Sequence, residues 1–173
     1  MSDLIHVTQV LRDAGLVDTT WFNDYMRDRG TALHRATQLH DEGDLNPDSV
    51  DPAIKESLAG YLKFLKEVEP VILAVEEKVE KPKIYQGRLD RRLKINGREG
   101  VLDIKGVDMT ATRLQVAAYA MTFDRPMARW ALLLRVKLGS YKLIEYRERR
   151  KDDLDFMAAV RIAAFRRRHG LTS

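Results

Sequence analysis

Two aspartates and a lysine stand on the arms of a predicted hairpin, in the segment GRLDRRLKINGREGVLDIKG at residues 87–106. An Asn-Gly pair between alternating apolar residues is a strong turn signal, because both turn residues take positive φ. With the pair at 96–97 as the turn, Asp90 lies directly opposite Asp103, and Lys105 is on the same face. The spacing therefore predicts two neighbouring carboxylates with an ammonium group beside them.

Opposed carboxylates in a sheet require a compensating cation, since like charges directly across from each other destabilise the pairing. Carboxylate oxygens are ligands for Mg²⁺ or Mn²⁺, and such an ion lowers the pKa of bound water and clamps a phosphate. Taken alone, a D-x-K motif is expected by chance in a chain of this composition, and charged hairpin faces are common. The three residues are thus candidates for a divalent-cation site, and they need further support.

Two predicted helices outside the hairpin carry further candidate residues, each of which also has a structural explanation. Gln115 and Tyr119 are four residues apart on the following helix and so share one face. Tyr119 could instead be a core aromatic residue, and Gln115 an ordinary surface residue. Upstream, His34 lies on a helix within GTALH, where a lone histidine is more often structural than a ligand.

The order of these motifs resembles the RecB-like branch of the PD-(D/E)XK nucleases. That branch combines an upstream G-T-x-x-H histidine with G-x-x-D, D-x-K and then Q-x-x-x-Y on the following helix. This sequence shows them as GTALH (30–34), GRLD (87–90), DIK (103–105) and QVAAY (115–119). The resemblance implies an α/β fold with a restriction-endonuclease-like PD-(D/E)XK core, in which α-helices flank a central mixed β-sheet.

The resemblance also implies a role for the matching residues around the metal. His34, Asp90 and Asp103 are expected to hold Mg²⁺ or Mn²⁺, and imidazole suits Mn²⁺ better than Mg²⁺. The main-chain carbonyl of Ile104 is expected as a further ligand. Lys105 is expected to orient the attacking water or to offset charge on the phosphate.

Other site residues are also taken from the resemblance. Gln115 and Tyr119 are expected to hold the DNA strand near the metal. A glutamate ligand is usual upstream of the hairpin, and we prefer Glu76 to Glu77, although little in the sequence separates them.

Basic residues suggest a polyanionic partner. Arg88, Arg92 and Lys94 lie on the same predicted hairpin face and could follow a phosphate backbone, although solvation of an exposed face explains them equally well. Residues 125–173 contain 13 Lys/Arg against 5 Asp/Glu, whereas the net charge of the whole chain is +4. This asymmetry, which includes the run at 166–168, favours nucleic acid as the partner.

The elements that must position these residues follow from hydrophobic periodicity and turn signals. Strands are predicted at 71–80, 84–94, 99–106, 128–138 and 141–146. Helices are predicted at 7–14, 21–43, 52–68, 108–123 and 152–168, with Thr19 or Thr20 capping the second and Asp108 or Thr110 capping the fourth. Helices, three strands, a helix, two strands and a last helix form an α/β layout.

Composition fits one domain over residues 1–173. A hydrophobic fraction of 45% and a charged fraction of 32% are typical of a globular rather than a disordered chain. No apolar run approaches the ~20 residues that span a bilayer, and the N-terminus lacks a signal-peptide layout. The absence of cysteine excludes disulfides, thiolate zinc sites and iron–sulfur clusters. We therefore expect an intracellular, cytoplasmic protein. The resemblance to small phage-encoded recombination and repair nucleases implies a bacterial or phage-infected host cell.

The predicted function is a metal-dependent DNA exonuclease in DNA end processing, recombination or repair, because Q-x-x-x-Y is associated with family members that process DNA ends. The chain has no phosphate-binding loop of the ATPase type, so a helicase or a single-strand annealing protein is a candidate partner. One alternative is a non-catalytic nucleic-acid binding module that kept the nuclease fold, which the complete motif set counts against. The other is an endonuclease of the same superfamily, although no separate target-recognition domain is evident.

Overall fold

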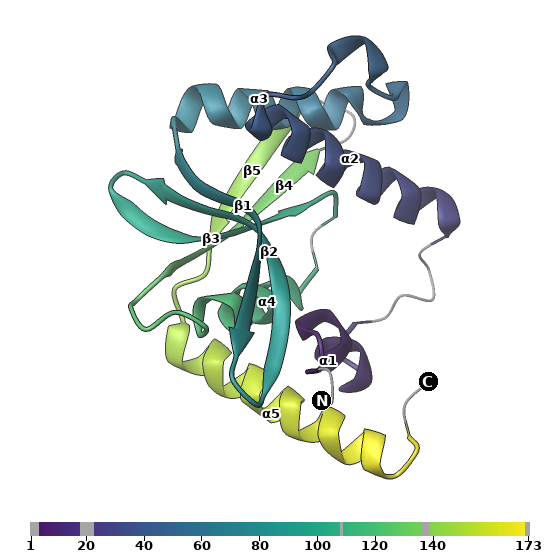
Figure 1. The fold of residues 1–173 in the computed structure, drawn as a ribbon, viewed down its shortest axis with the longest axis vertical. Coiled ribbons are helices and arrows are strands. Elements are labelled where there is room, and N and C mark those ends of the chain that lie inside the picture. Colours follow the sequence, from purple (N-terminus) through teal and green to yellow (C-terminus); the bar gives the residue numbers. More distant parts are fainter. Residues whose placement is uncertain (1–3, 18–22, 108, 136–138, 172–173) are drawn as a thin grey trace.

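A five-stranded mixed sheet forms the centre of the computed structural model, which describes residues 4–17, 23–107, 109–135 and 139–171. Its strands, in both chain and spatial order, are β1 (Val71–Lys81), β2 (Tyr85–Ile95), β3 (Arg98–Lys105), β4 (Ala128–Arg135) and β5 (Ser140–Glu145) (Figure 1). Neighbouring strands are antiparallel, except that β3 and β4 are parallel. A parallel pair needs a crossover connection, and a helix supplies it here.

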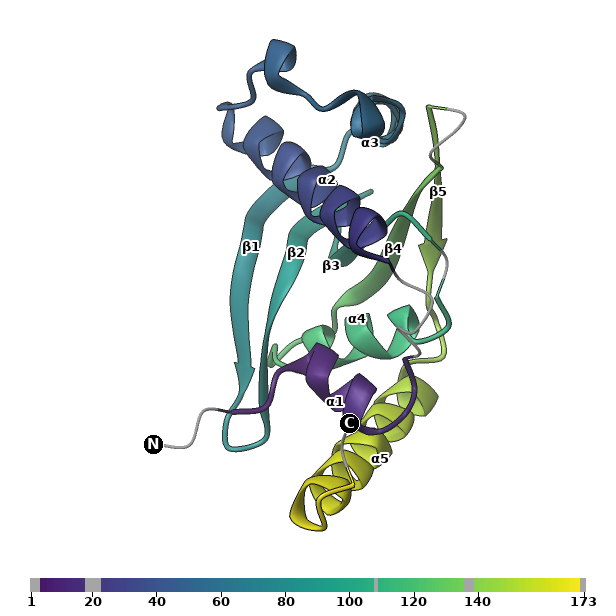
Figure 2. The same ribbon diagram turned by 90° about the vertical axis from the view of Figure 1, so that its right-hand side faces the viewer.

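Helices cover both faces of this sheet (Figure 2). One face carries α2 (Asp24–Glu42) and α3 (Lys55–Val68), with the short 3-10 helices η1 (Pro47–Ser49) and η2 (Pro52–Ile54) between them. The other face carries α1 (Val7–Asp13), the crossover helix α4 (Thr112–Ala120) and α5 (Arg149–Arg168). The predicted α/β fold, a central mixed sheet flanked by helices, is confirmed.

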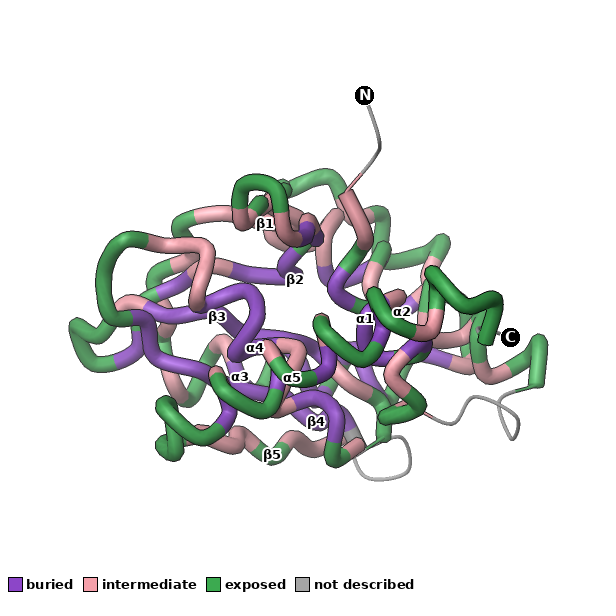
Figure 3. The backbone as a smooth tube through the Cα atoms, turned by 90° about the horizontal axis from the view of Figure 1, so that it is seen from below, coloured by how far each residue is buried: buried purple, intermediate pink, exposed green. Residues whose placement is uncertain are grey.

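Two hydrophobic clusters hold these layers together. On one face, Trp130, Leu132 and Leu134 of β4 pack against α2 and α3. On the other, Tyr85 and Val101 pack against α1, α4 and α5. Figure 3 shows the result, in which β2, β3 and β4 are largely buried while the helices expose their outer sides. A strand covered on both faces reads as a nearly continuous apolar run, as residues 130–134 of β4 do.

The hairpin between β2 and β3 has the predicted turn. Asn96 and Gly97 have φ values of +49° and +76°, which the tight turn requires. The main-chain ladder runs from this turn to the pair Arg91↔Leu102, in the predicted register throughout. The hairpin prediction is therefore confirmed for this ladder.

Strand β2 changes its orientation near Asp90. Leu89 packs with α1, α4 and α5, whereas Leu93 packs with α2 and α3. Residues four apart in a regular strand point to the same face, so the strand must rotate between them. Glu76, opposite Asp90 in the register of β1 and β2, has a φ of +50°, an uncommon value for a residue with a side chain. The irregularity thus affects two neighbouring strands at one point.

Helix beginnings differ from the prediction in detail. The side chain of Asn23 caps α2, while α4 begins after Ala111 without a side-chain cap, so Thr110 is not its cap. Helix α5 begins at Arg149, earlier than predicted. The parts of the prediction that lie outside the described residues are Thr19, Thr20, Asp108, residues 21–22 and residues 136–138. Within the part of the chain that the structure describes, no helix has the length and apolar character to cross a membrane.

Candidate metal centre

Carboxylates from three neighbouring strands approach His34 of α2. Glu76 comes from β1, Asp90 from β2 and Asp103 from β3. The Nδ1 atom of His34 lies 3.5 Å from Oδ2 of Asp90. His34, Glu76 and Asp90 each offer a ligand atom within 4.8 Å of the other two. Oxygen ligands together with one imidazole at this spacing suit a single divalent cation.

Asp90 is held by the neighbouring strand. It is 8% exposed, and its Oδ2 accepts a hydrogen bond from the main-chain nitrogen of Ile104 at 2.6 Å. The β2–β3 ladder ends at Arg91↔Leu102, and this side-chain contact follows it. Asp90 and Asp103 therefore do not form the predicted facing ladder pair, because β2 turns away at this point, but both line the same cavity. The carbonyl role of Ile104 stays a prediction.

Asp103 and Lys105 form an ion pair in which the aspartate is buried and the lysine is half-buried. Asp103 is 1% exposed, and its Oδ2 lies 2.9 Å from Nζ of Lys105. Burial raises the pKa of Asp103 to about 6; the attraction of Lys105 opposes this rise, and the charge of Asp90 adds to it. Burial opposes the charge of Lys105 too, but Asp103 and Asp90 outweigh it and raise the pKa of that ammonium group.

The second carboxylate oxygen of Asp103 fits a metal ligand. Oδ1 is buried and has no hydrogen-bond partner among the described residues. A buried oxygen without a partner is costly, and a bound cation would satisfy it. The donor set around it, carboxylates and one imidazole, also fits Mg²⁺ or Mn²⁺.

Glu76 rather than Glu77 reaches this group of residues. The pKa of Glu76 is raised, first by burial and then by the charge of Asp90, while His34 lowers it. Glu77 instead accepts a hydrogen bond from Nε of Arg92 at 2.7 Å. The left-handed backbone of Glu76 accompanies this difference between two adjacent glutamates.

A cavity of about 280 Å³ is lined by Asp90 and Asp103 but not by Glu76. On its α4 side, Nε2 of Gln115 donates a hydrogen bond to the hydroxyl of Tyr119 at 3.1 Å. A Cβ atom at Gly87 would lie 2.7 Å from Cε1 of Tyr119, so the tyrosine ring requires a glycine in GRLD. Burial, with the charge of Asp103, raises the pKa of Tyr119, whose hydroxyl keeps its proton. The lining residues are His6, Val7, Thr8, His34, Gly87, Arg88, Asp90, Asp103, Lys105, Gln115 and Tyr119.

Two polar lining residues, His6 and Thr8, were not among the predicted site residues. Both lie at the beginning of α1, which the main chain fixes against β2, because the nitrogen of Gln86 donates to the carbonyl of Ile5 at 2.9 Å. No spacing in the sequence indicates this contact, since it joins residues far apart in the chain.

The basic hairpin residues that were predicted to contact phosphate differ in whether they line the cavity. Arg88 is exposed and lines the cavity. Arg92 does not line it, and instead donates hydrogen bonds to Glu77 at 2.7 Å and to Glu99 at 3.0 Å. Lys94 is exposed near the turn. The structure thus brings Arg88 to the site, but not Arg92.

Arginines at the end of α5 make contacts within the chain. Arg167 donates a hydrogen bond from Nε to Asp13 at 2.6 Å, and Arg166 donates to the carbonyl of Leu171 at 2.7 Å. These contacts link α5 to α1 and to the following turn. They favour a structural role for both arginines over a free basic track.

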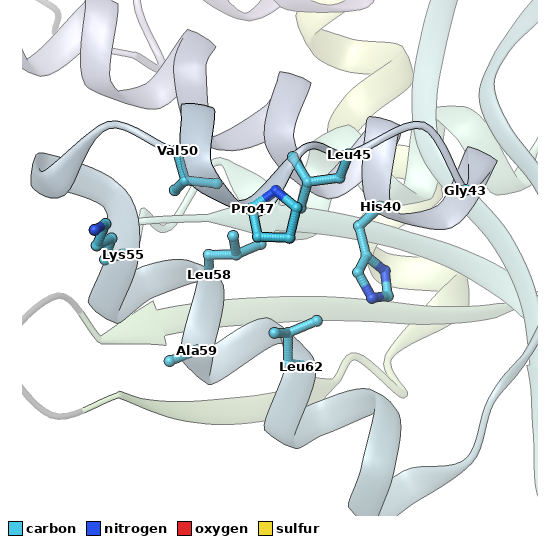
Figure 4. Close-up of a pocket in the computed structure, with 9 residues that line it drawn as sticks. All are labelled: His40, Gly43, Leu45, Pro47, Val50, Lys55, Leu58, Ala59 and Leu62. Atoms are coloured by element: carbon cyan, nitrogen blue, oxygen red, sulfur yellow. The ribbon is translucent and has the colours of Figure 1, made fainter.

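Further cavities lie beside the site and apart from it. One of about 290 Å³ shares Lys105 and Gln115 with the site, and one of about 220 Å³ shares His34 and Lys105. A separate cavity of about 460 Å³ lies between α2 and α3 (Figure 4). It is lined by His40, Gly43, Leu45, Pro47, Val50, Lys55, Leu58, Ala59 and Leu62. These side chains are mainly apolar and offer no carboxylate ligand.

Comparisons with known proteins find similarity among solved structures. No protein-family model and no curated protein matches the chain. The crystal structure of SSO0001 is similar over 95% of this chain and 75% of that one, with a TM-score of 0.46 and 17% sequence identity. Two crystal structures of LHK-Exo, an alkaline exonuclease from Laribacter hongkongensis, are similar over 98% of this chain and 95% of theirs. Their TM-scores are 0.40 for the complex with dAMP and 0.39 for the other, each at 11% identity.

Proposed function

We propose that this chain is a metal-dependent deoxyribonuclease of the RecB-like PD-(D/E)XK type, a single nuclease domain that acts as an exonuclease on DNA ends. The observation that carries the proposal is that His34, Asp90 and the Asp103–Lys105 ion pair line one cavity, while Glu76 offers a ligand atom within 4.8 Å of those of His34 and Asp90. The preference for DNA ends rests on the Q-x-x-x-Y motif, whose glutamine and tyrosine are joined by a hydrogen bond at this cavity.

The metal would be held by His34, Glu76, Asp90 and Asp103, with the carbonyl of Ile104 as a further ligand. When bound, Mg²⁺ or Mn²⁺ lowers the pKa of a coordinated water and offsets charge on the phosphate. The imidazole in this set favours Mn²⁺ over Mg²⁺.

The remaining side chains of the cavity act on the DNA. Lys105, fixed 2.9 Å from Asp103, can donate a hydrogen bond to the attacking water or to a phosphate oxygen as negative charge develops. The protonated hydroxyl of Tyr119 and the amide of Gln115 contact the strand being cut. Arg88 contacts a neighbouring phosphate at the cavity rim.

The biological setting is part of the same proposal. We infer a task in DNA end processing, recombination or repair, in the cytoplasm of a bacterial or phage-infected cell. This sequence contains no phosphate-binding loop of the ATPase type, and we propose a helicase or a single-strand annealing protein as the partner.

A cleavage assay on DNA with and without ends tests this proposal. End-labelled linear DNA and covalently closed circular DNA are incubated with Mg²⁺, Mn²⁺ or EDTA. We expect degradation of the linear DNA from its ends with either metal, no cleavage in EDTA and an intact circle. Nicking or linearisation of the circle would identify an endonuclease instead.

The binding-module alternative predicts another result in the same assay. DNA would be bound, as measured by a mobility shift, but neither substrate would be cut at any metal concentration. Asp103→Asn is the matched control, because it should resemble such a module while the wild type does not.

A further inference from the structure

A buried arginine side chain lies directly behind the candidate metal centre. Arg91 follows Asp90 on β2, and its side chain is 0% exposed. Its Nη1 donates a hydrogen bond to the main-chain carbonyl of Asp90 at 2.6 Å and lies 3.8 Å from Oε1 of Glu76. One guanidinium group therefore contacts the main chain of one candidate ligand and the carboxylate of another.

Two helical residues fix this guanidinium from behind. Oδ2 of Asp41, on α2, accepts hydrogen bonds from Nε of Arg91 and from the hydroxyl of Tyr61, each at 2.5 Å. The guanidinium carbon lies 5.8 Å from the centre of the Tyr61 ring, within cation–π range. Because α2 also carries His34, the contact between Arg91 and Asp41 ties the histidine's helix to the strand of Asp90.

Stability alone does not account for this arrangement. Replacing a buried ion pair by apolar residues of similar size is often neutral or stabilising, because both charges lose their hydration. Nη2 of Arg91 is moreover buried without a hydrogen-bond partner among the residues described, which adds a further cost. The polar contacts that the Arg91 side chain makes with described residues lead to the metal centre or to the two residues that hold the guanidinium.

We propose that Arg91 is a positioning residue of the metal centre. Held by Asp41 and Tyr61, it keeps the Asp90 main chain and the Glu76 carboxylate in the geometry that the cation requires, without touching metal or DNA itself. This inference rests on the proposed function, since positioning has a purpose only if a metal binds there. Loss of a residue that orients metal ligands typically weakens metal affinity about 10–100-fold.

A charge-neutral double variant separates positioning from folding. Arg91→Met alone would leave the buried carboxylate of Asp41 without its arginine partner, with only Tyr61 and His40 still in contact with it, so Asp41→Asn is combined with it. The amide can still accept a hydrogen bond from Tyr61. Mn²⁺ binding is measured by titration calorimetry, and folding in EDTA is measured by circular dichroism and thermal unfolding. We expect a folded double variant with a Kd for Mn²⁺ raised about 10–100-fold.

A second inward-facing ion pair provides the control. Arg129 of β4 is 4% exposed and donates a hydrogen bond to Asp153 at 2.6 Å, and neither residue lines the metal cavity. The matching variant Arg129→Met with Asp153→Asn should keep the wild-type Kd for Mn²⁺. Equal weakening in both double variants would overturn the proposal, because the effect would then be general.

The remaining outcomes also decide. Unchanged Mn²⁺ affinity in a folded Asp41→Asn, Arg91→Met protein refutes positioning and leaves the nuclease proposal standing. Wild-type protein that binds no Mn²⁺ refutes the metal centre, and both proposals fail together.

If the double variant does not fold, Tyr61→Phe decides, because it removes one hydrogen bond and keeps both charges. Several-fold weaker Mn²⁺ binding supports positioning, and an unchanged Kd overturns it.

Discussion

Strands β4 and β2 both lie inside the sheet, but they bury very different side chains. In β4, Trp130, Leu132 and Leu134 face α2 and α3, Ala131 is also buried, and the buried Arg129 is paired with Asp153 of α5 away from the site. In β2, residues 89–91 are a leucine, an aspartate and an arginine, and all are buried. The first strand follows the regular alternation of a covered sheet, whereas the second departs from it at the candidate site.

The difference separates what stabilises this fold from what could serve chemistry. Apolar burial on β4 contributes roughly 25 cal/mol per Å² of surface removed from water. Buried charges on β2 and β3 contribute no comparable stability, since each loses its hydration. Substitutions of apolar residues in β4 should therefore lower the free energy of unfolding and leave metal affinity unchanged. Substitutions of the buried polar residues around the site should weaken metal binding and leave the free energy of unfolding unchanged or slightly higher.

The largest effect is expected for Asp103→Asn. Loss of one metal ligand should reduce cleavage of linear DNA about 10²–10³-fold or more, the scale found when a main electrostatic element of a site is removed. The free energy of unfolding in EDTA should be unchanged or slightly higher. Burial disfavours the charged form of Asp103, as its raised pKa indicates, and the substitution removes that charge. Calorimetry measures the affinity for Mn²⁺, and thermal unfolding in EDTA measures the stability. An Mn²⁺ Kd equal to that of the wild type would contradict the assignment of Asp103 as a ligand.

The opposite pattern is expected for Leu132→Ala on β4. Leu132 is fully buried against α2 and α3, so truncation should lower the free energy of unfolding by about 2–5 kcal/mol. Urea unfolding measures the loss, and calorimetry below the unfolding transition should show a wild-type Kd for Mn²⁺. A large change in metal affinity would mean that the two regions are coupled.

Acid should weaken metal binding through the buried carboxylates. A proton and a metal compete for Asp103, whose pKa in the folded protein is raised to about 6. Mn²⁺ affinity should therefore fall as the pH drops through about 6. Without metal, folding depends on pH in the opposite direction. The pKa of Asp103 is raised from 3.8 to about 6 in the folded protein, so the contribution of this group to the free energy of unfolding decreases as the pH rises through that range. Asp103→Asn should weaken both trends, while Glu76, whose pKa is also raised, would continue them in part. Trends as steep as in the wild type would exclude Asp103 as their source.

The smallest effect is expected for Arg88→Gln at the cavity rim. Loss of one phosphate contact should flatten the log–log salt dependence of DNA binding by about 0.9 for duplex or about 0.7 for single strands. The triple variant of Arg166, Arg167 and Arg168 to glutamine should leave that slope unchanged, because two of the three make contacts within the chain. A flatter slope in the triple variant alone would place the DNA track along α5.

Local signals in the sequence predicted the hairpin well. The Asn-Gly turn needs only its own backbone conformation and the alternation of its arms, so both turn and register follow from adjacent residues. The residues of the D-x-K and Q-x-x-x-Y motifs lie on the expected elements and at one cavity, although their roles stay predictions. The same local reasoning could not find the rotation of β2 at Asp90, which depends on packing against helices from distant parts of the chain.

Residues behind the site were also beyond the reach of sequence patterns. Asp41 and Tyr61 meet Arg91 across 50 and 30 positions of the chain, and nothing in their local sequences indicates that contact. Arg92 was expected on the DNA-facing side, but its neighbour Glu77 and the cross-strand Glu99 bind it. In both cases the outcome depends on which charges the tertiary fold brings together.

Anomalous diffraction from crystals soaked in Mn²⁺ tests the central claim most directly. The account predicts one strong anomalous peak within bonding distance of His34, Glu76 and Asp90, with Asp103 completing the group, and no such peak in crystals of Asp103→Asn. A peak elsewhere, or none at saturating Mn²⁺, would contradict the account.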